Sequence, residues 1–316
     1  MPIDCVRATR RGGGPARRRV PRWPSPRSAR RRLQAGGRGW VVIGSGGRLG
    51  STLCGLLPLA VGIRASSVDL FSLDTVLRLL RQAGARVVVN TAALTHVDEA
   101  ERSPGLAQAV NATMVGVLAE ACGALNALLV QVSTDYVFGS DVQRRTPYAE
   151  DAPPAPVNVY GASKLAGERL AAAAPRHLIV RTSGLYGARS ASKPGFVETI
   201  VRLAQQQPRL RVVADQWCSP SYALHVAQAI VRLVEAEGRG TFHAVNAGAA
   251  SWYELACHAI RTAGLGAEVE PIPLAEYGHA APRPHYTVLD TARHDRHTRV
   301  PLPPWQAAVV EYLRAA

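Results

Sequence analysis

The chain has 316 residues, 47% of them hydrophobic, which is enough to bury one large core or a core with a smaller lobe. Its formal net charge of +14 is concentrated at one end, because residues 1–39 hold twelve arginines against the single acid Asp4 and the other 277 residues carry only +3. This distribution argues against a nucleic-acid-binding domain in residues 40–316, and we expect no specific nucleic-acid partner.

Residues 1–39 are rich in Arg, Gly, Pro and Ser and lack an apolar run. A segment of this composition buries too little surface to offset its ordering entropy, so we predict a disordered extension. Three interpretations are open: an arm attracted to phosphates or anionic lipid, an organelle-targeting peptide, or a mis-assigned start codon in an arginine-biased coding sequence. We favour the third, because the first predicted strand begins directly after this segment.

The sequence gives no indication of a secretory signal or a membrane span. The first 39 residues offer no apolar stretch for a signal peptide, and the longest later run, residues 53–63, is too short for a bilayer and contains Pro58. The five cysteines are odd in number and include no CxxC pair, which is typical of free thiols in a reducing compartment. We therefore expect a cytoplasmic protein without a membrane partner. We also predict no metal site.

From Trp40 onward the chain alternates strand and helix. Apolar, β-rich runs without polar alternation occur at residues 40–44, 59–63, 85–90, 127–134 and 177–182, and amphipathic stretches of helical length lie between most of them. This pattern predicts an α/β fold with a doubly wound, Rossmann-type parallel sheet covered by helices on both faces. In such a sheet the ligand binds beyond the carboxyl ends of the strands.

The first strand ends in a glycine-rich turn, "GSGGRLG", with glycines at positions 44, 47 and 50. Glycine permits a tight turn and a close backbone approach to a pyrophosphate, and the following helix offers unpaired N–H groups. Gly-rich turns are common, but the place of Gly44, Gly47 and Gly50 between the first strand and the first helix favours a dinucleotide site.

Position 64 lies where such folds usually place an acid on the adenosine ribose, yet it is Arg64, and Asp69 follows five residues later. A guanidinium there suits a 2′-phosphate, and Arg48 in the glycine turn is a second candidate donor. We therefore predict NADPH in preference to NADH, with NADH still possible. The alternative is that both arginines are solvated surface residues.

The strand at 127–134 ends in Ser133 and Thr134, followed by Asp135, and a predicted helix then carries Tyr160 and Lys164 on one face. An ammonium beside a phenol favours the phenolate, so we expect Lys164 to lower the pKa of Tyr160 toward neutrality. The chain has only two lysines among 37 cationic residues. Arginine is a poor substitute at this position, because its rigid fork cannot replace a compact ammonium.

With these motifs in order, the chain resembles the extended short-chain dehydrogenase/reductases, and within them the dTDP-4-dehydrorhamnose reductase family. The resemblance covers roughly residue 40 to the C-terminus. It rests on a series of blocks that includes "GSGGRLG", "VVVNTAALTHVDEAE", "VSTDYVFG", "NVYGASKLAGE", "VRTSGLYG" and "PRPHYTVLD".

The resemblance implies roles for individual residues. The catalytic set is Thr134, Tyr160 and Lys164. The cofactor contacts beyond those already named are Leu49, Leu70, Ala92, Ala93 and Leu94. Substrate is held near Thr134, Asp135 and Gly184, and Arg283 of an "RP" pair is a candidate contact of the diphosphate, although a Pro-rich surface loop explains that pair equally well.

The sequence departs from the family at three places. Gly184 stands where many members have Trp against the sugar, so we expect different substrate packing there. Cys218 and His225 replace the usual Gly and Asp of their loop. The segment around the second strand is abbreviated, which suggests an unusual adenosine end.

The family implies NADPH-dependent reduction of the C4 keto group of a dTDP-4-keto-6-deoxy sugar in dTDP-L-rhamnose biosynthesis, with a homodimer possible. The resemblance divides the chain into the extension 1–39, a cofactor domain at 40–182 with the catalytic residues, and a mixed segment at 183–316 that completes the sheet and forms the sugar-nucleotide lobe. Two alternatives stay open. One is another sugar-nucleotide 4-ketoreductase or epimerase, and the other is a non-catalytic subunit like the regulatory subunit of methionine adenosyltransferase.

Overall fold

The computed structural model describes residues 37–187, 194–278 and 280–315. The predicted extension at 1–39 lies almost wholly outside these residues. The main element is a six-stranded parallel sheet with the order β2-β1-β3-β4-β5-β10. Its strands are β1 (Trp40–Ile43), β2 (Val61–Ile63), β3 (Val87–Asn90), β4 (Leu128–Thr134), β5 (His177–Thr182) and β10 (Gly240–His243). The predicted Rossmann-type sheet is therefore confirmed.

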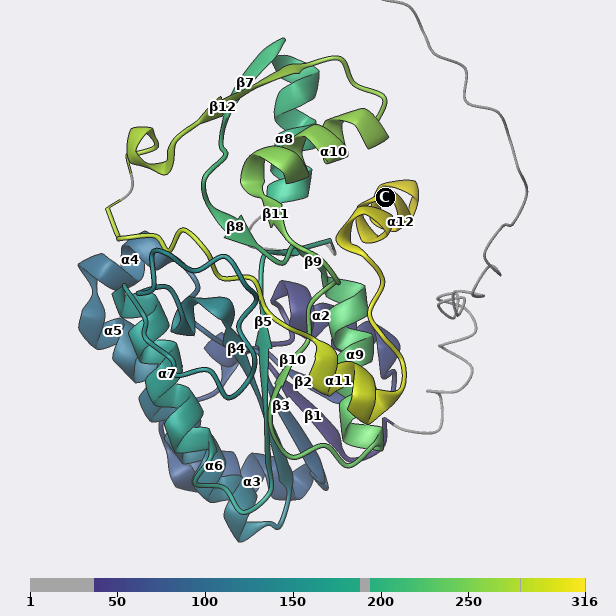
Figure 1. Ribbon diagram of the computed structural model, residues 1–316. Coiled ribbons are helices and arrows are strands. Elements are labelled where there is room, and N and C mark those ends of the chain that lie inside the picture. The colour runs from purple at the N-terminus through teal and green to yellow at the C-terminus, as the bar shows by residue number, and fades with distance from the viewer. Residues whose placement is uncertain (1–36, 188–193, 279, 316) are drawn as a thin grey trace, which may run out of the picture.

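Helices cover both faces of this sheet, which explains why its strands are apolar throughout (Figure 1). On one face, α2 (Arg48–Leu56) packs against α9 (Ala223–Glu235), and their buried residues share a core cluster with β1, β4 and β5. On the other face, α3 (Leu73–Gln82) packs against α6 (Met114–Ala124). The helix α7 (Val159–Ala171) lies beside α6 and β4.

The helix that leads into α6 is nearly continuous from residue 104. It comprises α5 (Pro104–Gln108), the π-helical turn η2 (Ala109–Thr113) and α6, and it follows the short α4 (Val97–Arg102). By length and composition, Pro104–Ala124 could cross a membrane. Half of that apolar window is buried inside the protein, and its α6 part packs on α3 and α7, as a core helix does.

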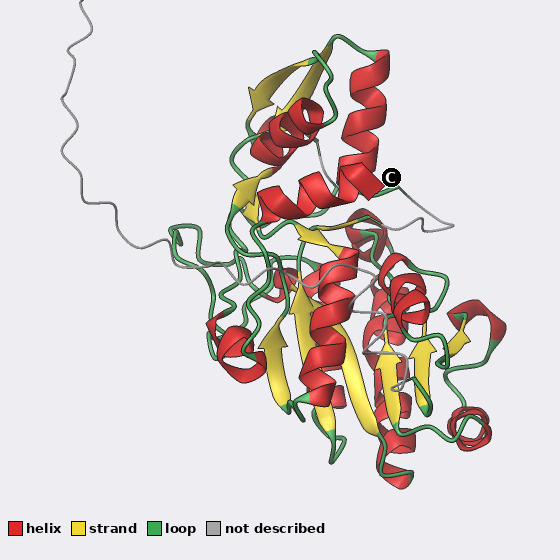
Figure 2. Cartoon of the chain, turned by 90° about the vertical axis from the view of Figure 1, so that its right-hand side faces the viewer, coloured by secondary structure: helices red, strands yellow, loops and turns green. Residues whose placement is uncertain are grey.

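A smaller lobe lies beyond the carboxyl ends of the strands (Figures 1 and 2). Its parallel pair of β7 (Arg209–Val213) and β12 (Glu268–Ile272) packs on α8 (Phe196–Gln206) and α10 (Trp252–Thr262), and α12 (Trp305–Ala315) packs on α10. The remaining elements are short: β6 (Leu185–Tyr186), β8 (Trp217–Cys218), β9 (Ser221–Tyr222), β11 (Ala250–Ser251), α11 (Ala292–Thr298), η1 (Ala65–Ser67), η3 (Asp135–Val137) and η4 (Leu274–Glu276).

Candidate active site

A cleft of about 870 Å³ runs across the carboxyl ends of β1 to β5. Because parallel strands end at the same edge, the segments that follow five separate strands meet there. The residues predicted for the site that line this cleft are Gly44, Gly47, Arg48, Leu49, Arg64, Leu70, Ala92, Ala93, Leu94, Thr134, Asp135, Tyr160, Lys164 and Gly184. Gly50, Asp69 and Arg283 lie outside the lining.

The glycine turn is held by close backbone packing. Gly44 has a φ of +85° and a Cβ there would lie 2.7 Å from the amide nitrogen of Ala92, so no larger residue fits without a shift. A Cβ at Gly50 would lie 2.2 Å from the Gly44 carbonyl oxygen, so Gly50 supports the turn from behind. The N-cap of α2 is Gly47, which supplies no side-chain cap. The amides of the first turn of α2 therefore face the cleft as an anion site.

The charged residues predicted for the adenosine end fall in different environments. Arg64 is exposed and lines the cleft, where its guanidinium can meet a phosphate. Arg48 also lines the cleft, but its Nη1 lies 3.1 Å from Glu198 Oε1 and donates to the Gly187 carbonyl. Asp69 accepts from the Phe71 amide in a local turn and does not line the cleft.

The strand β4 and the helix α7 bring the predicted catalytic residues together. Thr134 is the last residue of β4 and is buried. Asn158 caps α7 by accepting from the Gly161 amide at 2.8 Å, which fixes the first turn that carries Tyr160. One turn later, Lys164 is 4% exposed and its Nζ donates to the Val132 carbonyl at 2.7 Å.

The expected lowering of the Tyr160 pKa is not found. Burial raises the pKa of Tyr160 to about 12, although a hydrogen bond with Thr134 opposes the rise. Burial also lowers the pKa of Lys164 to about 8, against the attraction of Glu168. Desolvation therefore dominates, and the opposing influence comes from the Thr134 hydrogen bond and not from the Lys164 charge. The phenol of Tyr160 is protonated at neutral pH, which is the form that can donate a proton.

Asp135, directly after Thr134, is enclosed by hydroxyl donors. Ser183 donates to its Oδ2 at 2.7 Å, Thr287 donates to the same oxygen, and Thr134 donates to Oδ1 at 3.1 Å. Burial raises the pKa of this carboxyl, and the three hydrogen bonds oppose that rise. Asp135 thus fixes the Thr134 hydroxyl at the end of β4.

Asn111 links the π-helical turn η2 to the loop after β3, which lines the cleft, and to α7. It lies in the π-helical turn η2, accepts from the Leu94 amide at 2.8 Å, and donates to the Leu94 carbonyl and to the Ser163 hydroxyl. Asn111 therefore holds the loop after β3 against α7.

The residues that depart from the family pattern are accommodated in different ways. Gly184 has a φ of +52°, and a Cβ there would lie 3.2 Å from Pro220 Cα and 3.5 Å from Cys218 Sγ, so this backbone leaves little room for a Trp. His225 is fully buried beside Asn246 and Glu311. Neither Cys218 nor His225 lines the cleft.

Arg283 pairs with Asp98 of α4 at 2.9 Å and is 9% exposed. It lies outside the lining of the cleft, but its charge acts on Tyr136, which follows Asp135 and packs edge-on against Tyr160. Among the described residues there is no cluster of three or more His, Cys, Asp or Glu side chains placed to hold a metal ion.

Several lining residues escaped the sequence reasoning. Thr95, His96, Thr182, Ser183 and Leu185 belong to the cleft. All follow or end β3 and β5, so the rule that ligands bind at the carboxyl ends of strands points to them. Their residue types carry no motif of their own.

Comparison with known proteins places the chain among sugar-nucleotide reductases. Residues 39–316 match the family model described as the RmlD substrate binding domain. The chain is similar to a dTDP-4-dehydrorhamnose reductase of Mycolicibacterium smegmatis, with 38% identity over 96% of this chain and 94% of the relative. It is also similar to a dTDP-4-keto-6-deoxy-D-glucose reductase of Streptomyces niveus, with 36% identity over 86% of this chain and 95% of the relative.

Among solved structures, the fold is similar to that of a dTDP-4-dehydrorhamnose reductase from Bacillus anthracis in complex with NADP. The TM-score is 0.83 and the identity 32%, over 88% of this chain and 99% of the other.

Proposed function

Since this chain belongs to the RmlD substrate binding domain family, we propose that its cleft is the active site of a dTDP-4-dehydrorhamnose reductase. The enzyme is an NADPH-dependent oxidoreductase that reduces the C4 keto group of a dTDP-4-keto-6-deoxy sugar, the reductive step of dTDP-L-rhamnose biosynthesis, and NADH is a possible substitute. The observation that carries the proposal is the convergence of Thr134, Tyr160 and Lys164 in the cleft that begins at the glycine turn.

Features of this chain itself support the binding of a dinucleotide in the cleft. The turn at Gly44 excludes side-chain atoms where a pyrophosphate must approach, and the uncapped start of α2 supplies N–H donors. Arg64 would bind the 2′-phosphate of NADPH. When bound, the cofactor supplies the hydride for the keto carbon.

The catalytic residues then act on the keto oxygen of the substrate. Tyr160, protonated at neutral pH, donates its proton to that oxygen as negative charge develops there. The Thr134 hydroxyl donates to Asp135 in the structure, and it would donate to the keto oxygen instead once substrate is bound. Lys164 places a positive charge next to the phenol and stabilises the phenolate that remains after the transfer.

Substituting Tyr160 with Phe tests this assignment. We expect Y160F to keep NADPH binding within about twofold and to lose about 10²-fold to 10⁴-fold of turnover, because the proton donor alone is removed. Cofactor binding is measured by fluorescence titration and turnover by NADPH consumption with dTDP-4-dehydrorhamnose. A variant that turns over at the wild-type rate contradicts the assignment.

A second candidate is reduction of a different dTDP-4-keto-6-deoxy sugar. Gly184 favours it, because this position borders the cleft without a side chain to pack on the sugar. Comparison of kcat/KM for dTDP-4-dehydrorhamnose and for dTDP-4-keto-6-deoxy-D-glucose separates the two. If neither keto sugar supports NADPH consumption, the non-catalytic alternative is favoured instead.

The organisation of the chain follows from the same proposal. We take residues 40–182 as the cofactor domain and 183–316 as the segment that supplies β10 to the sheet and the smaller lobe above the cleft. We further propose that the protein works in the cytoplasm as a homodimer, without a nucleic-acid or membrane partner.

A further inference from the structure

One turn beyond Lys164 on α7, Glu168 forms an enclosed ion pair with Arg181 of β5. Arg181 donates from Nε at 2.9 Å to one carboxylate oxygen and from Nη2 at 2.8 Å to the other. Both side chains are 5% exposed. Burying two charges costs desolvation energy, so such a pair is weak evidence of a purely stabilising role.

The ion pair lies one helical turn from Lys164. Glu168 is four residues after Lys164 on the same helix, so their side chains share one face. Lys164 is 4% exposed, and its ammonium donates to the carbonyl of Val132. A buried ammonium with a neutral acceptor needs a negative charge nearby to remain protonated.

The other charged and titratable groups around Lys164 do not supply that charge from the same side. Tyr160 on α7 is a neutral phenol at pH 7. Asp135, beyond β4, already accepts from three hydroxyls. On α4, Glu101 accepts from the Val159 amide at the start of α7. The turn η2, packed on α7, contains no titratable residue.

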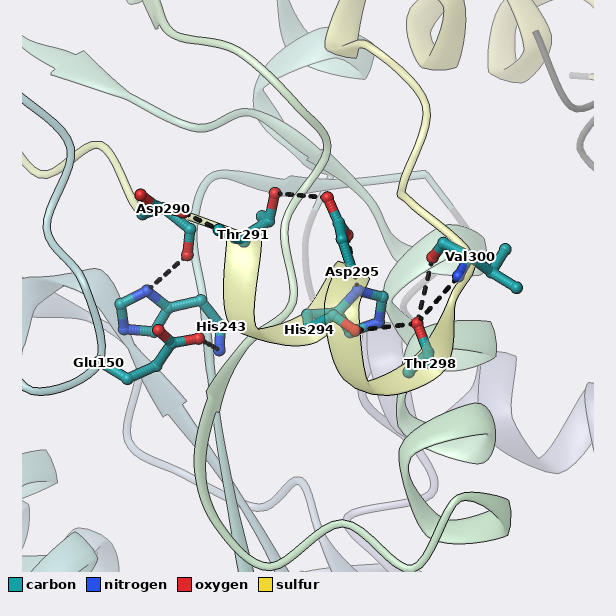
Figure 3. A network of polar contacts seen from close by, with 9 residues as sticks. Glu150, His243, Asp290, Thr291, His294, Asp295, Thr298 and Val300 are labelled. Carbon is teal, nitrogen blue, oxygen red and sulfur yellow. Dashed lines mark hydrogen bonds and ion pairs between the residues drawn. The ribbon is translucent and has the colours of Figure 1, made fainter. Parts of the chain in front are cut away.

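The guanidinium of Arg181 does not line the cleft and is held by further contacts. It lies 5.0 Å over the ring of Phe138 and donates to the carbonyl of Glu150 at 3.4 Å. Figure 3 shows Glu150 in turn beside His243, whose amide donates to the Glu150 carboxylate and whose ring meets the Asp290 carbonyl. Arg181 is therefore held from several directions, and its fork sets the position of the Glu168 carboxylate.

We propose that Glu168 is the counter-ion of Lys164, and that Arg181 is a positioning residue that holds this carboxylate in place. The inference rests on the catalytic role proposed above for Lys164. Burial draws the pKa of Lys164 down to about 8, and Glu168 opposes that fall. Glu168 thereby keeps the lysine charged at the pH where the enzyme works.

The scarcity of lysine makes a direct test possible. The chain contains only Lys164 and Lys193, so protein labelled with ¹³C at lysine Cε gives two signals, and a Lys193→Arg variant assigns them. We expect Glu168→Gln to lower the pKa of Lys164 by at least about one unit. The alkaline limb of turnover, where Lys164 loses its proton as pH rises, is expected to move down by the same amount. Glu120→Gln is the matched control, because it removes the same charge at an exposed position on α6. We expect it to change neither the Lys164 pKa nor the alkaline limb of turnover.

A second variant covers the case in which Glu168→Gln fails to fold. The double variant Glu168→Gln/Arg181→Met removes both buried charges with little change in volume, a replacement that proteins tolerate. It is also expected to lower the Lys164 pKa, because Glu168 is the charge that raises this pKa in the native protein. An unchanged Lys164 pKa in the folded variants overturns the inference. A Lys164 pKa that falls while the pH profile of turnover stays fixed supports the counter-ion and contradicts the catalytic role of Lys164.

Discussion

Lysine is rare in this chain, and the site of Lys164 explains why arginine does not replace it there. Its Nζ meets a backbone carbonyl of β4 at 2.7 Å in a space that is almost closed to solvent. A guanidinium carries five donors in a rigid plane and would leave several of them unpaired. The residue type could therefore be inferred from the sequence, whereas the balance of burial and charge that sets its pKa could not.

At the same scale, Arg64 offers a prediction about cofactor choice. Arg64→Ala removes the cation expected at the 2′-phosphate, so we expect kcat/KM for NADPH to fall about tenfold to a hundredfold, as for a lost charge-assisted hydrogen bond. The value for NADH is expected to change little. The ratio of the two kcat/KM values measures the effect, and an unchanged ratio identifies Arg64 as a solvated surface residue.

Among the elements, the glycine turn and α2 carry a prediction with an internal control. Gly50→Ala places a Cβ within 2.2 Å of the Gly44 carbonyl oxygen, so we expect a loss of about 1–3 kcal/mol in unfolding free energy and weaker NADPH binding. Gly55→Ala lies on the same helix and meets nothing within 4 Å. It is expected to gain up to about 1 kcal/mol from helix propensity.

Denaturant unfolding and cofactor titration of both variants test the contrast. Equal stability of the two alanine variants would show that the packing of α2 on the glycine turn contributes little to the unfolding free energy.

For the whole molecule, Glu198 of α8 connects the smaller lobe to α2, which packs on the six-stranded sheet. Its Oε1 accepts from Arg48 of α2 at 3.1 Å, from the Gly187 amide at 2.7 Å, and from Tyr312 of α12 at 3.0 Å. Glu198→Ala removes the acceptor that these three donors share, so we expect a loss of about 1–3 kcal/mol in unfolding free energy.

Thermal unfolding measures this loss. Glu268→Ala is the control, because Glu268 pairs with Arg209 across β12 and β7 while both side chains are more than 60% exposed. Exposed pairs of this kind contribute about 0–1 kcal/mol. If both variants melt at the same temperature, Glu198 does not link the two parts.

The sequence by itself determined the parallel sheet, the glycine turn and the residues proposed to be catalytic, because each is encoded locally: apolar runs without alternation, glycines at a strand end, and a phenol and an ammonium one helical turn apart. Most of the cleft-lining residues that were predicted follow the carboxyl ends of strands, where ligands of parallel sheets bind. The tertiary structure alone decided which charges reach the cleft. Arg64 and Arg48 both line it, but Arg48 is paired with Glu198, and Arg283 is paired with Asp98 outside the lining. These partners are 150 and 185 residues away along the chain. It also decided the protonation of Tyr160, because desolvation depends on every element packed around a group and on no single stretch of sequence.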